Sequence, residues 1–197
     1  YSPLEPRMTS SGNLHSDRTA DAILKAAGVR KGICIVLGIG DGKLARALAR
    51  RSKMSVIGTD PEPAAVKNAR RDALRTGIYG VRLSYRQVKS LEATDFPSDF
   101  ANLVIITNST EQGVVDEALR MLQPGRGIGL IGDAGGEGKT ILRDFPGSTS
   151  LKISGKDYVQ LKRAPKANIG EWTHLYGRPD NTAFGGEPLG GAKTATD

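Results

Sequence analysis

Three glycines at alternate positions form the clearest candidate for chemistry in this sequence. Gly38, Gly40 and Gly42 follow the apolar run Ile33–Leu37 and precede residues with helical spacing. Glycine lets the backbone turn sharply and lets a ligand approach closely. The start of the following helix presents free backbone amides to polar or anionic groups. The pattern predicts a nucleotide-type site at the carboxyl end of a sheet; the alternative is that the glycines only form a turn.

An acid ends the next predicted strand, about twenty residues further on. Val56–Asp60 ends in a carboxylate, which can accept hydrogen bonds from both hydroxyls of a ribose. Asp60 could instead cap the helix that follows it. Lys43 stands where a dinucleotide fingerprint requires its third glycine, which disfavours NAD.

The elements that must position these residues alternate between strands and helices. Apolar runs predict five strands, at 33–37, 55–59, 81–85, 103–106 and 127–131. One helix is predicted with Ser16 or Asp17 as its cap and an end before Gly28, and others around 44–48, over 62–75 and over 114–122. This alternation predicts an α/β fold with parallel strands and right-handed crossovers. Thr140–Arg143 and Tyr158–Lys162 are weaker candidates for short antiparallel strands at the sheet edge.

The order of these motifs resembles class I S-adenosylmethionine-dependent methyltransferases over roughly residues 17–132. The resemblance is carried by Val36–Ala45, Val56–Asp60, Asn68–Arg70 and Leu122–Gly125. It implies S-adenosylmethionine as the cofactor. It also implies a Rossmann-like three-layer sandwich, with a mostly parallel sheet ordered 3-2-1-4-5 and a short antiparallel edge hairpin.

The resemblance further implies a set of cofactor-binding residues. Gln87 takes the place of an acid that binds the adenine amine, and its amide can still accept that bond. Asn108, after the fourth predicted strand, could orient an acceptor. The full set is Gly38, Ile39, Gly40, Asp41, Gly42, Asp60, Pro61, Gln87, Val88 and Asn108.

Several positions depart from the pattern of that family. Val36 replaces the acid that binds the methionine amino group, so that group would rely on loop carbonyls or on Asp41. Asn102 replaces an aspartate, and Thr107–Thr110 is not an Asn-Pro-Pro-aromatic loop. No catalytic base is assigned, although His15 and His174 are the two histidines of the chain.

A narrower similarity concerns bacterial proteins in which a methyltransferase-like domain precedes a PQQ-like β-propeller. It rests on Gly38–Leu44, Gly77–Gly80, Glu171–His174 and Asp180–Thr182. We therefore expect an N-terminal arm at 1–13, a cofactor-binding domain at 14–163 and an extended tail at 164–197. The Gly- and Pro-rich tail, anchored by Trp172, is expected to contact a β-propeller domain or a partner chain.

Composition limits the other classes of partner. Residues 41–75 hold nine Lys or Arg and four acids, and aromatic residues are only 5% of the chain. This favours a solvated helical face over a nucleic-acid surface. Cys34, the sole cysteine, excludes an internal disulfide and is expected to be buried and inert. No apolar run reaches the ~18 residues of a membrane helix, and the sequence leaves a cytoplasmic or a periplasmic location open.

Three hypotheses about function follow. The first is a methyltransferase with an acceptor that the sequence does not identify. The second is a catalytically degenerate cofactor-binding or structural module associated with a propeller, which Val36 supports. The third is an NAD-binding reductase domain, which Lys43 disfavours.

Overall fold

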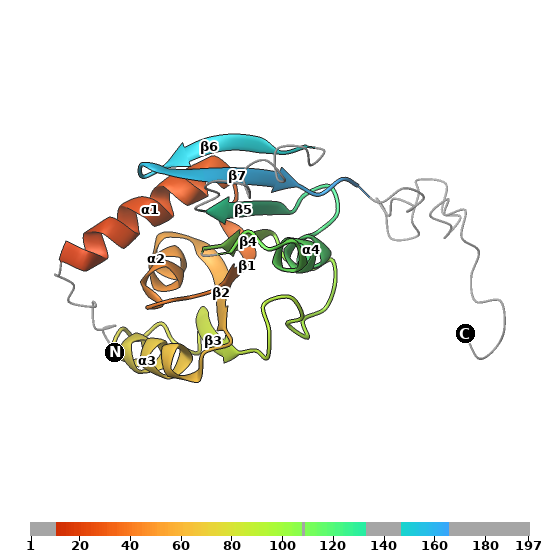
Figure 1. Cartoon of the computed structure of the whole chain (residues 1–197). Helices are drawn as coiled ribbons and strands as arrows, with labels where there is room; N and C mark the ends of the chain where they lie inside the picture. Colours follow the sequence, from red (N-terminus) through yellow and green to blue (C-terminus); the bar gives the residue numbers. More distant parts are fainter. Residues whose placement is uncertain (1–10, 108, 133–146, 166–197) are drawn as a thin grey trace, which may run out of the picture. The chain divides into compact units, whose positions relative to one another are not determined.

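A computed structural model describes residues 11–107, 109–132 and 147–165 of the chain (Figure 1). Contacts divide the chain after Arg163, and every element described lies in the first unit. Expectations for residues 1–10, Asn108, Thr140–Arg143 and the tail with Trp172 and His174 lie outside the described residues. The elements are α1 (Ser11–Ala27), β1 (Lys31–Leu37), α2 (Lys43–Arg51), β2 (Lys53–Asp60), α3 (Pro63–Leu74), β3 (Leu83–Gln87), β4 (Leu103–Ile106), α4 (Gln112–Met121), β5 (Ile128–Gly132), β6 (Thr149–Ile153) and β7 (Lys156–Lys162).

The seven strands form one sheet in the order β3-β2-β1-β4-β5-β7-β6. Strands β1 to β5 are parallel, and β7 runs antiparallel to both β5 and β6. The expected order 3-2-1-4-5 with an antiparallel edge hairpin is therefore confirmed. The carboxyl ends of β1 and β2 carry the glycine loop and Asp60, as the motif positions required.

Most expected boundaries are shifted by one or two residues, and three differences have a structural explanation. β3 begins at Leu83 rather than at Val81, because residues 78–82 form a turn that leaves Val81 78% exposed. The first strand of the hairpin is β6, which the sequence pattern did not indicate. Helix α1 already begins at Ser11, and Asp17 does not cap it: its carboxylate instead pairs with Arg50 of α2.

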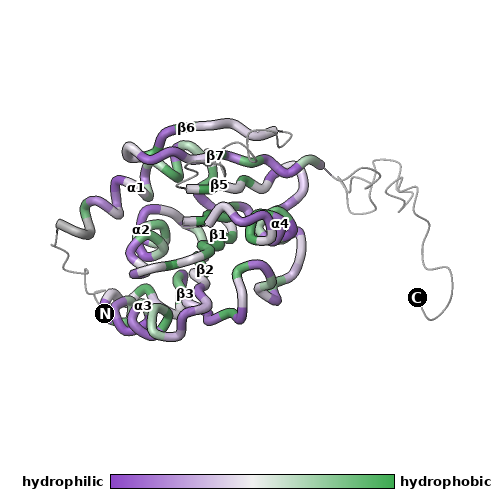
Figure 2. The backbone as a smooth tube through the Cα atoms, viewed as in Figure 1, coloured by the Kyte–Doolittle hydropathy of each residue, from purple (hydrophilic) through white to green (hydrophobic). Residues whose placement is uncertain are grey.

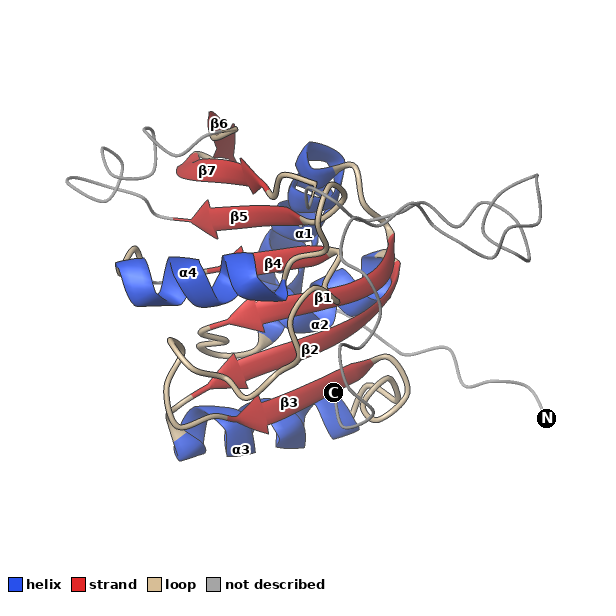
Figure 3. Ribbon diagram, turned by 90° about the vertical axis from the view of Figure 1, so that its right-hand side faces the viewer, coloured by secondary structure: helices blue, strands red, loops and turns tan. Residues whose placement is uncertain are grey.

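Helices cover both faces of the sheet, which gives three layers (Figure 3). One apolar cluster joins α1, α2 and α3 to one face, and a second joins α4 and residues 96–101 to the other. The apolar residues concentrate along the central strands (Figure 2), and all four residues of β4 are buried. Within the described residues, no helix combines the length and the apolar character that a membrane crossing requires.

Most of the basic residues between 41 and 75 interact within the chain. Arg50 and Arg51 pair with Asp17 and Asp21, which joins α2 to α1. The Arg70 guanidinium donates two hydrogen bonds to the Tyr85 carbonyl, at 2.9 and 2.7 Å. Lys43 pairs with Asp41, while Arg71 and Arg75 lie within 4.0 Å of Asp72. The contacts of Arg50, Arg51 and Arg70 thus contribute to the packing of α2 and α3.

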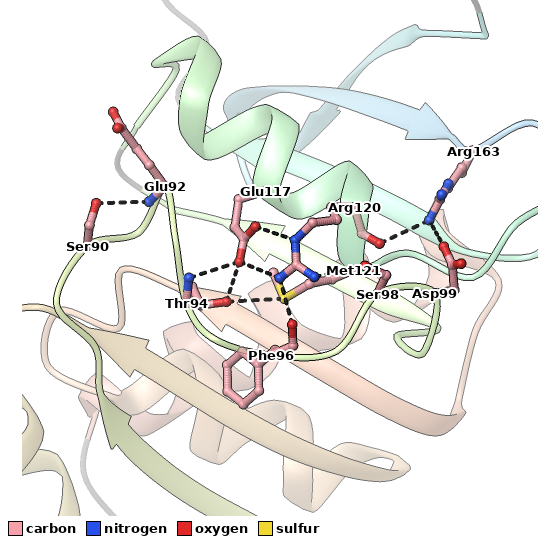
Figure 4. Close-up of polar contacts among 10 residues, drawn as sticks. All are labelled: Ser90, Glu92, Thr94, Phe96, Ser98, Asp99, Glu117, Arg120, Met121 and Arg163. Atoms are coloured by element: carbon pink, nitrogen blue, oxygen red, sulfur yellow. Dashed lines mark hydrogen bonds and ion pairs between the residues drawn. The ribbon is translucent and has the colours of Figure 1, made fainter. Parts of the chain in front are cut away.

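A buried carboxylate fixes the long connection between β3 and β4 against α4 (Figure 4). Glu117 accepts hydrogen bonds from the amide and the hydroxyl of Thr94, and it pairs with Arg120 at 2.7 Å. Arg120 also donates to the Phe96 carbonyl and to the Ser98 hydroxyl. Burial alone would raise the pKa of Glu117, but the bonds from Arg120 and Thr94 lower it to about 2. The connection is therefore held along the C-terminal half of α4 as it leads to the start of β4.

Candidate cofactor site

The glycine loop bends over the carboxyl end of β2. The amides of Gly38 and Ile39 both donate to the Thr59 carbonyl, at 2.9 and 3.2 Å. The Thr107 hydroxyl, just after β4, donates to the Gly38 carbonyl. The loop is thus tied to both strands that flank β1, and its backbone position is defined before any ligand binds.

Gly42 closes the loop in a space that no side chain could share. Its φ is 72°, and its carbonyl accepts a 2.6 Å hydrogen bond from the buried Tyr85 hydroxyl. A Cβ atom there would lie 2.7 Å from the Ala69 Cβ and 2.9 Å from the Tyr85 hydroxyl. Gly40 differs, because it is exposed and a Cβ atom would meet nothing within 4 Å. The open side of the loop at Gly40 is therefore where a ligand can approach the backbone.

Asp60 joins the two predicted halves of the site. Its Oδ2 accepts a 3.4 Å hydrogen bond from the Gly40 amide, and its Oδ1 accepts a 3.0 Å bond from the Glu62 amide. The side chain that caps α3 belongs to Glu62, which accepts from the Ala64 amide. Asp60 is only 9% exposed. The carboxylate thus lies beside the exposed face of the glycine loop, where a ribose would be bound.

Gln87 and Val88 lie beside Asp60 on the next strand. Asp60 pairs with Gln87 in the register of β2 and β3, and the Val88 amide donates to the Asp60 carbonyl at 3.2 Å. Gln87 is exposed, whereas Val88 is buried. Nine of the ten expected site residues lie in the described part of the chain. They stand at or just after the ends of β1, β2 and β3, and therefore lie along the carboxyl edge of the sheet.

Two cavities lie along this edge. The glycine-loop cavity has a volume of about 310 Å³ and is bounded by the loop, Thr107, α1 and the β6–β7 hairpin. The Pro61 cavity has a volume of about 320 Å³ and is bounded by Pro61 and the segments after β3 and β4. The first is lined by His15, Ser16, Thr19, Ile39, Gly40, Asp41, Leu44, Thr107, Ile153, Ser154, Lys156 and Tyr158. The second is lined by Pro61, Lys89, Ser90, Leu91, Glu92, Ser109, Glu111 and Val114.

The carboxylate of Asp41 already has a partner in the loop. Its Oδ2 lies 2.7 Å from the Lys43 ammonium, and its Oδ1 accepts a 3.0 Å bond from the Lys43 amide. Burial would raise the pKa of Asp41, but the contacts with Lys43 outweigh it and lower that pKa. Asp41 is therefore an ionised member of an ion pair at the rim of the glycine-loop cavity.

Sequence reasoning assigned no role to several residues of this site. Thr107 is the first polar residue after the apolar strand β4, and this pattern could have indicated a site residue at the carboxyl end of that strand. Leu91 lies near Gly38, since a Cβ atom on that glycine would be 3.7 Å from Leu91 Cδ1. Tyr85 had no signal, because its contact with Gly42 joins two separate elements.

Cys34 lies away from this chemistry. The thiol is fully buried, and burial raises its pKa well above the usual range. A protonated, inaccessible thiol cannot act as a nucleophile, in agreement with the inert role expected from the sequence. The described residues also contain no cluster of three or more His, Cys, Asp or Glu side chains suited to a metal ion.

Comparisons with known proteins point to the same class. The methyltransferase domain family matches residues 35–125, which include the glycine loop, Asp60 and α4. No curated protein matches the chain in sequence. The sheet order and the solved structures below show the Rossmann-like fold of class I methyltransferases.

Three solved structures illustrate the likeness. A protein of Methanococcus maripaludis assigned as an S-adenosylmethionine-dependent methyltransferase is 17% identical, with a TM-score of 0.62 over 86% of this chain and 100% of that one. An RNA methyltransferase from Salinibacter ruber, in complex with S-adenosylhomocysteine, is 19% identical, with a TM-score of 0.60 over 81% and 95%. A geranyl diphosphate C-methyltransferase from Streptomyces coelicolor is 18% identical, with a TM-score of 0.51 over 57% and 44%.

Proposed function

We propose that this chain is an S-adenosylmethionine-dependent methyltransferase domain with its cofactor at the glycine loop and Asp60. The hydrogen bond between the Gly40 amide and Asp60 carries the proposal, because it brings the two nucleoside-binding motifs to one point. The match of residues 35–125 to the methyltransferase domain family supports it. So does the presence of cofactor or its product in solved structures with this fold, such as that from Salinibacter ruber.

The residues present fit this cofactor. Asp60 supplies a carboxylate for the ribose hydroxyls, and the open backbone at Gly40 admits the methionine chain. The Pro61 cavity, beside Asp60, would receive the adenine. The glycine-loop cavity, on the other side of Gly40, would receive the methionine end and the methyl acceptor.

When bound, this cofactor supplies a methyl group on a sulfonium, already activated for displacement. The protein then has to align the acceptor with that methyl group and exclude competing water. The Thr107 hydroxyl donates to the Gly38 carbonyl and so holds the glycine loop in place beside the cavity in which the acceptor would lie.

A ligand titration separates this proposal from the two alternatives. We expect S-adenosylhomocysteine to raise the melting temperature and NAD to leave it unchanged. At a hundredfold excess over the dissociation constant the stabilisation is about 2.7 kcal/mol, or roughly 5–10 °C for a domain of this size. A melting temperature that neither ligand changes would favour the structural module, and a response to NAD alone would favour the reductase.

Methyl transfer is tested separately from binding. The protein would be incubated with cofactor labelled in its methyl group and with panels of small acids, amines and phenols, followed by mass spectrometry. Transfer to one chemical class, abolished by excess S-adenosylhomocysteine, would establish the enzyme. Binding without transfer to any panel member or protein would favour the degenerate cofactor-binding module.

A further inference from the structure

The wall of the glycine-loop cavity opposite the glycines carries two basic side chains. Lys156 begins β7 and His15 lies in α1, and both line the cavity. Both are exposed, and neither has a hydrogen bond or ion pair to any other described residue. A cavity of about 310 Å³ is therefore bordered by an ammonium group whose charge is not compensated within the described part of the chain.

The acidic side of this cavity is already neutralised. Among the described residues that line it, Asp41 is the one carboxylate, and its partner Lys43 lies 2.7 Å away. With that pair counted as neutral, the remaining charge of the described lining residues is positive. Such a cavity attracts an anionic group.

The backbone around Lys156 is defined by contacts with α1. Ser154 and Gly155 form the tight turn between β6 and β7, with φ values of 51° and 82°. The Thr19 hydroxyl donates to the Ser154 hydroxyl at 3.3 Å, which links α1 to that turn. Lys156 follows the turn directly, so its backbone is fixed next to the end of the sheet that carries the glycine loop.

Val36, near the end of β1 and before the glycine loop, supplies no negative charge for the ammonium group of the cofactor. Val36 is only 1% exposed, and its carbonyl accepts a 3.3 Å bond from the Thr59 hydroxyl. The amino-acid end of the cofactor consists of an ammonium group and a carboxylate. With Val36 apolar and Asp41 paired to Lys43, the uncompensated charge that the described lining offers to this end is the cation of Lys156.

We propose that Lys156, with His15 beside it on α1, forms a subsite for the carboxylate of the cofactor's methionine end. The inference rests on the proposed function. This domain would then bind the methionine end of the cofactor through the carboxylate of that end. In the family pattern, an acid at the position of Val36 binds the ammonium group instead. The ribose at Asp60 and the chain passing Gly40 lead into this cavity, because both Gly40 and Lys156 line it.

The test compares two ligands that differ by one group. S-adenosylmethionine and its decarboxylated form share the adenosine, the sulfonium and the amine, so their affinity ratio isolates the carboxylate. We expect wild-type protein to prefer S-adenosylmethionine by about tenfold, the size of a charge-assisted hydrogen bond. In Lys156→Met that preference falls towards unity, while the affinity for the decarboxylated ligand stays unchanged. Isothermal titration calorimetry measures all four dissociation constants.

Two further variants are the controls for Lys156→Met. Lys152→Met removes a lysine of the same hairpin that does not line the cavity, and it should keep the wild-type ratio. Lys156→Arg keeps the charge and should retain most of the preference. If Lys156→Met keeps the full preference, the proposed carboxylate subsite is wrong. If wild-type protein binds neither ligand, it is the proposed function that fails.

Discussion

The amide of Gly40 donates to Oδ2 of Asp60 over 3.4 Å, across the gap between the loop after β1 and the end of β2. This long bond is the weaker of the two that the carboxylate accepts, since the Glu62 amide lies 3.0 Å from Oδ1. A ribose can therefore replace the Gly40 contact and leave the Glu62 contact in place. The Asp60 carboxylate is thus oriented by the Glu62 amide, while its bond from the Gly40 amide can be exchanged for one from a ligand.

Asp60→Ala should weaken binding of S-adenosylhomocysteine. Loss of charge-assisted bonds to the ribose costs about 1.5–3 kcal/mol, or roughly 10- to 150-fold in dissociation constant. Calorimetric titration measures the change. Because the Glu62 amide also loses its acceptor, a smaller decrease in the free energy of unfolding should accompany it.

Glu62→Ala is the matched control for Asp60. It removes the side-chain cap of α3, which should lower the free energy of unfolding by about 1 kcal/mol. Its affinity for S-adenosylhomocysteine should match the wild type. Equal affinities in the wild type and in Asp60→Ala would show that Asp60 only supports the turn into α3.

Gly42→Ala and Gly40→Ala should separate the structural glycine from the ligand-facing one. At Gly42 the new methyl group would lie 2.7 Å from Ala69 Cβ, so Ala69 and Tyr85 must shift. Overpacking of this kind costs about 1–3 kcal/mol in the free energy of unfolding. At Gly40 the space is open and φ is 54°, so the cost is mainly backbone strain of about 1 kcal/mol.

Affinity should show the reverse order for the two glycine variants. The methyl group of Gly40→Ala enters the open face where the ligand approaches. For the same loss of stability, Gly40→Ala should therefore raise the dissociation constant of S-adenosylhomocysteine more than Gly42→Ala does. Chemical denaturation and calorimetry measure both quantities. If Gly42→Ala retains full stability, the packing of Tyr85 against the loop is less restrictive than its 2.6 Å hydrogen bond indicates.

The central strands could be predicted because their sequence is dominated by burial. β1 and β4 are runs of apolar residues, and both lie inside the sheet with helices on either face. β6 could not be predicted, since it is an edge strand whose residues Thr149–Lys152 are largely accessible. Its position follows from pairing with β7, which a single segment does not reveal.

The binding loop of the site was predictable and its cavity was not. Gly38–Gly42 and Asp60 carry local patterns, because glycine spacing and a strand-terminal acid are visible within short segments. His15 and Lys156 are far apart in the sequence and line the same cavity because α1 contacts the β6–β7 turn. No local pattern marks either residue.

Tyr85→Phe should test how much the loop depends on the sheet. The hydroxyl is buried and donates to the Gly42 carbonyl, and burial raises the pKa of Tyr85 well above its usual range. Removal of this bond should lower the free energy of unfolding by about 1–2 kcal/mol, because the Gly42 carbonyl is left unpaired. Urea denaturation measures it. An unchanged midpoint would show that the carbonyl finds another donor.

Glu117 should make the stability of the domain sensitive to acid. Its pKa in the folded protein is about 2, below the ordinary value of 4.5, since Arg120 and Thr94 stabilise the carboxylate against the opposing effect of burial. A lowered folded-state pKa stabilises the protein above the unfolded value and loses that contribution as the pH falls through the folded value. The free energy of unfolding should therefore decrease between about pH 4.5 and pH 2.

Glu117→Gln removes this titration. At neutral pH the variant should be less stable by about 1.5–3 kcal/mol, because bonds from Arg120 and Thr94 to a charged acceptor are lost. The difference between variant and wild type should shrink as the pH falls towards 2, where the wild-type carboxylate also becomes neutral. Glu111→Gln, an exposed residue before α4 with no side-chain cap bond, is the control and should keep the wild-type pH dependence. Unfolding curves at intervals between pH 7 and pH 2 give the slopes, and parallel slopes for Glu117→Gln and wild type would contradict the assignment.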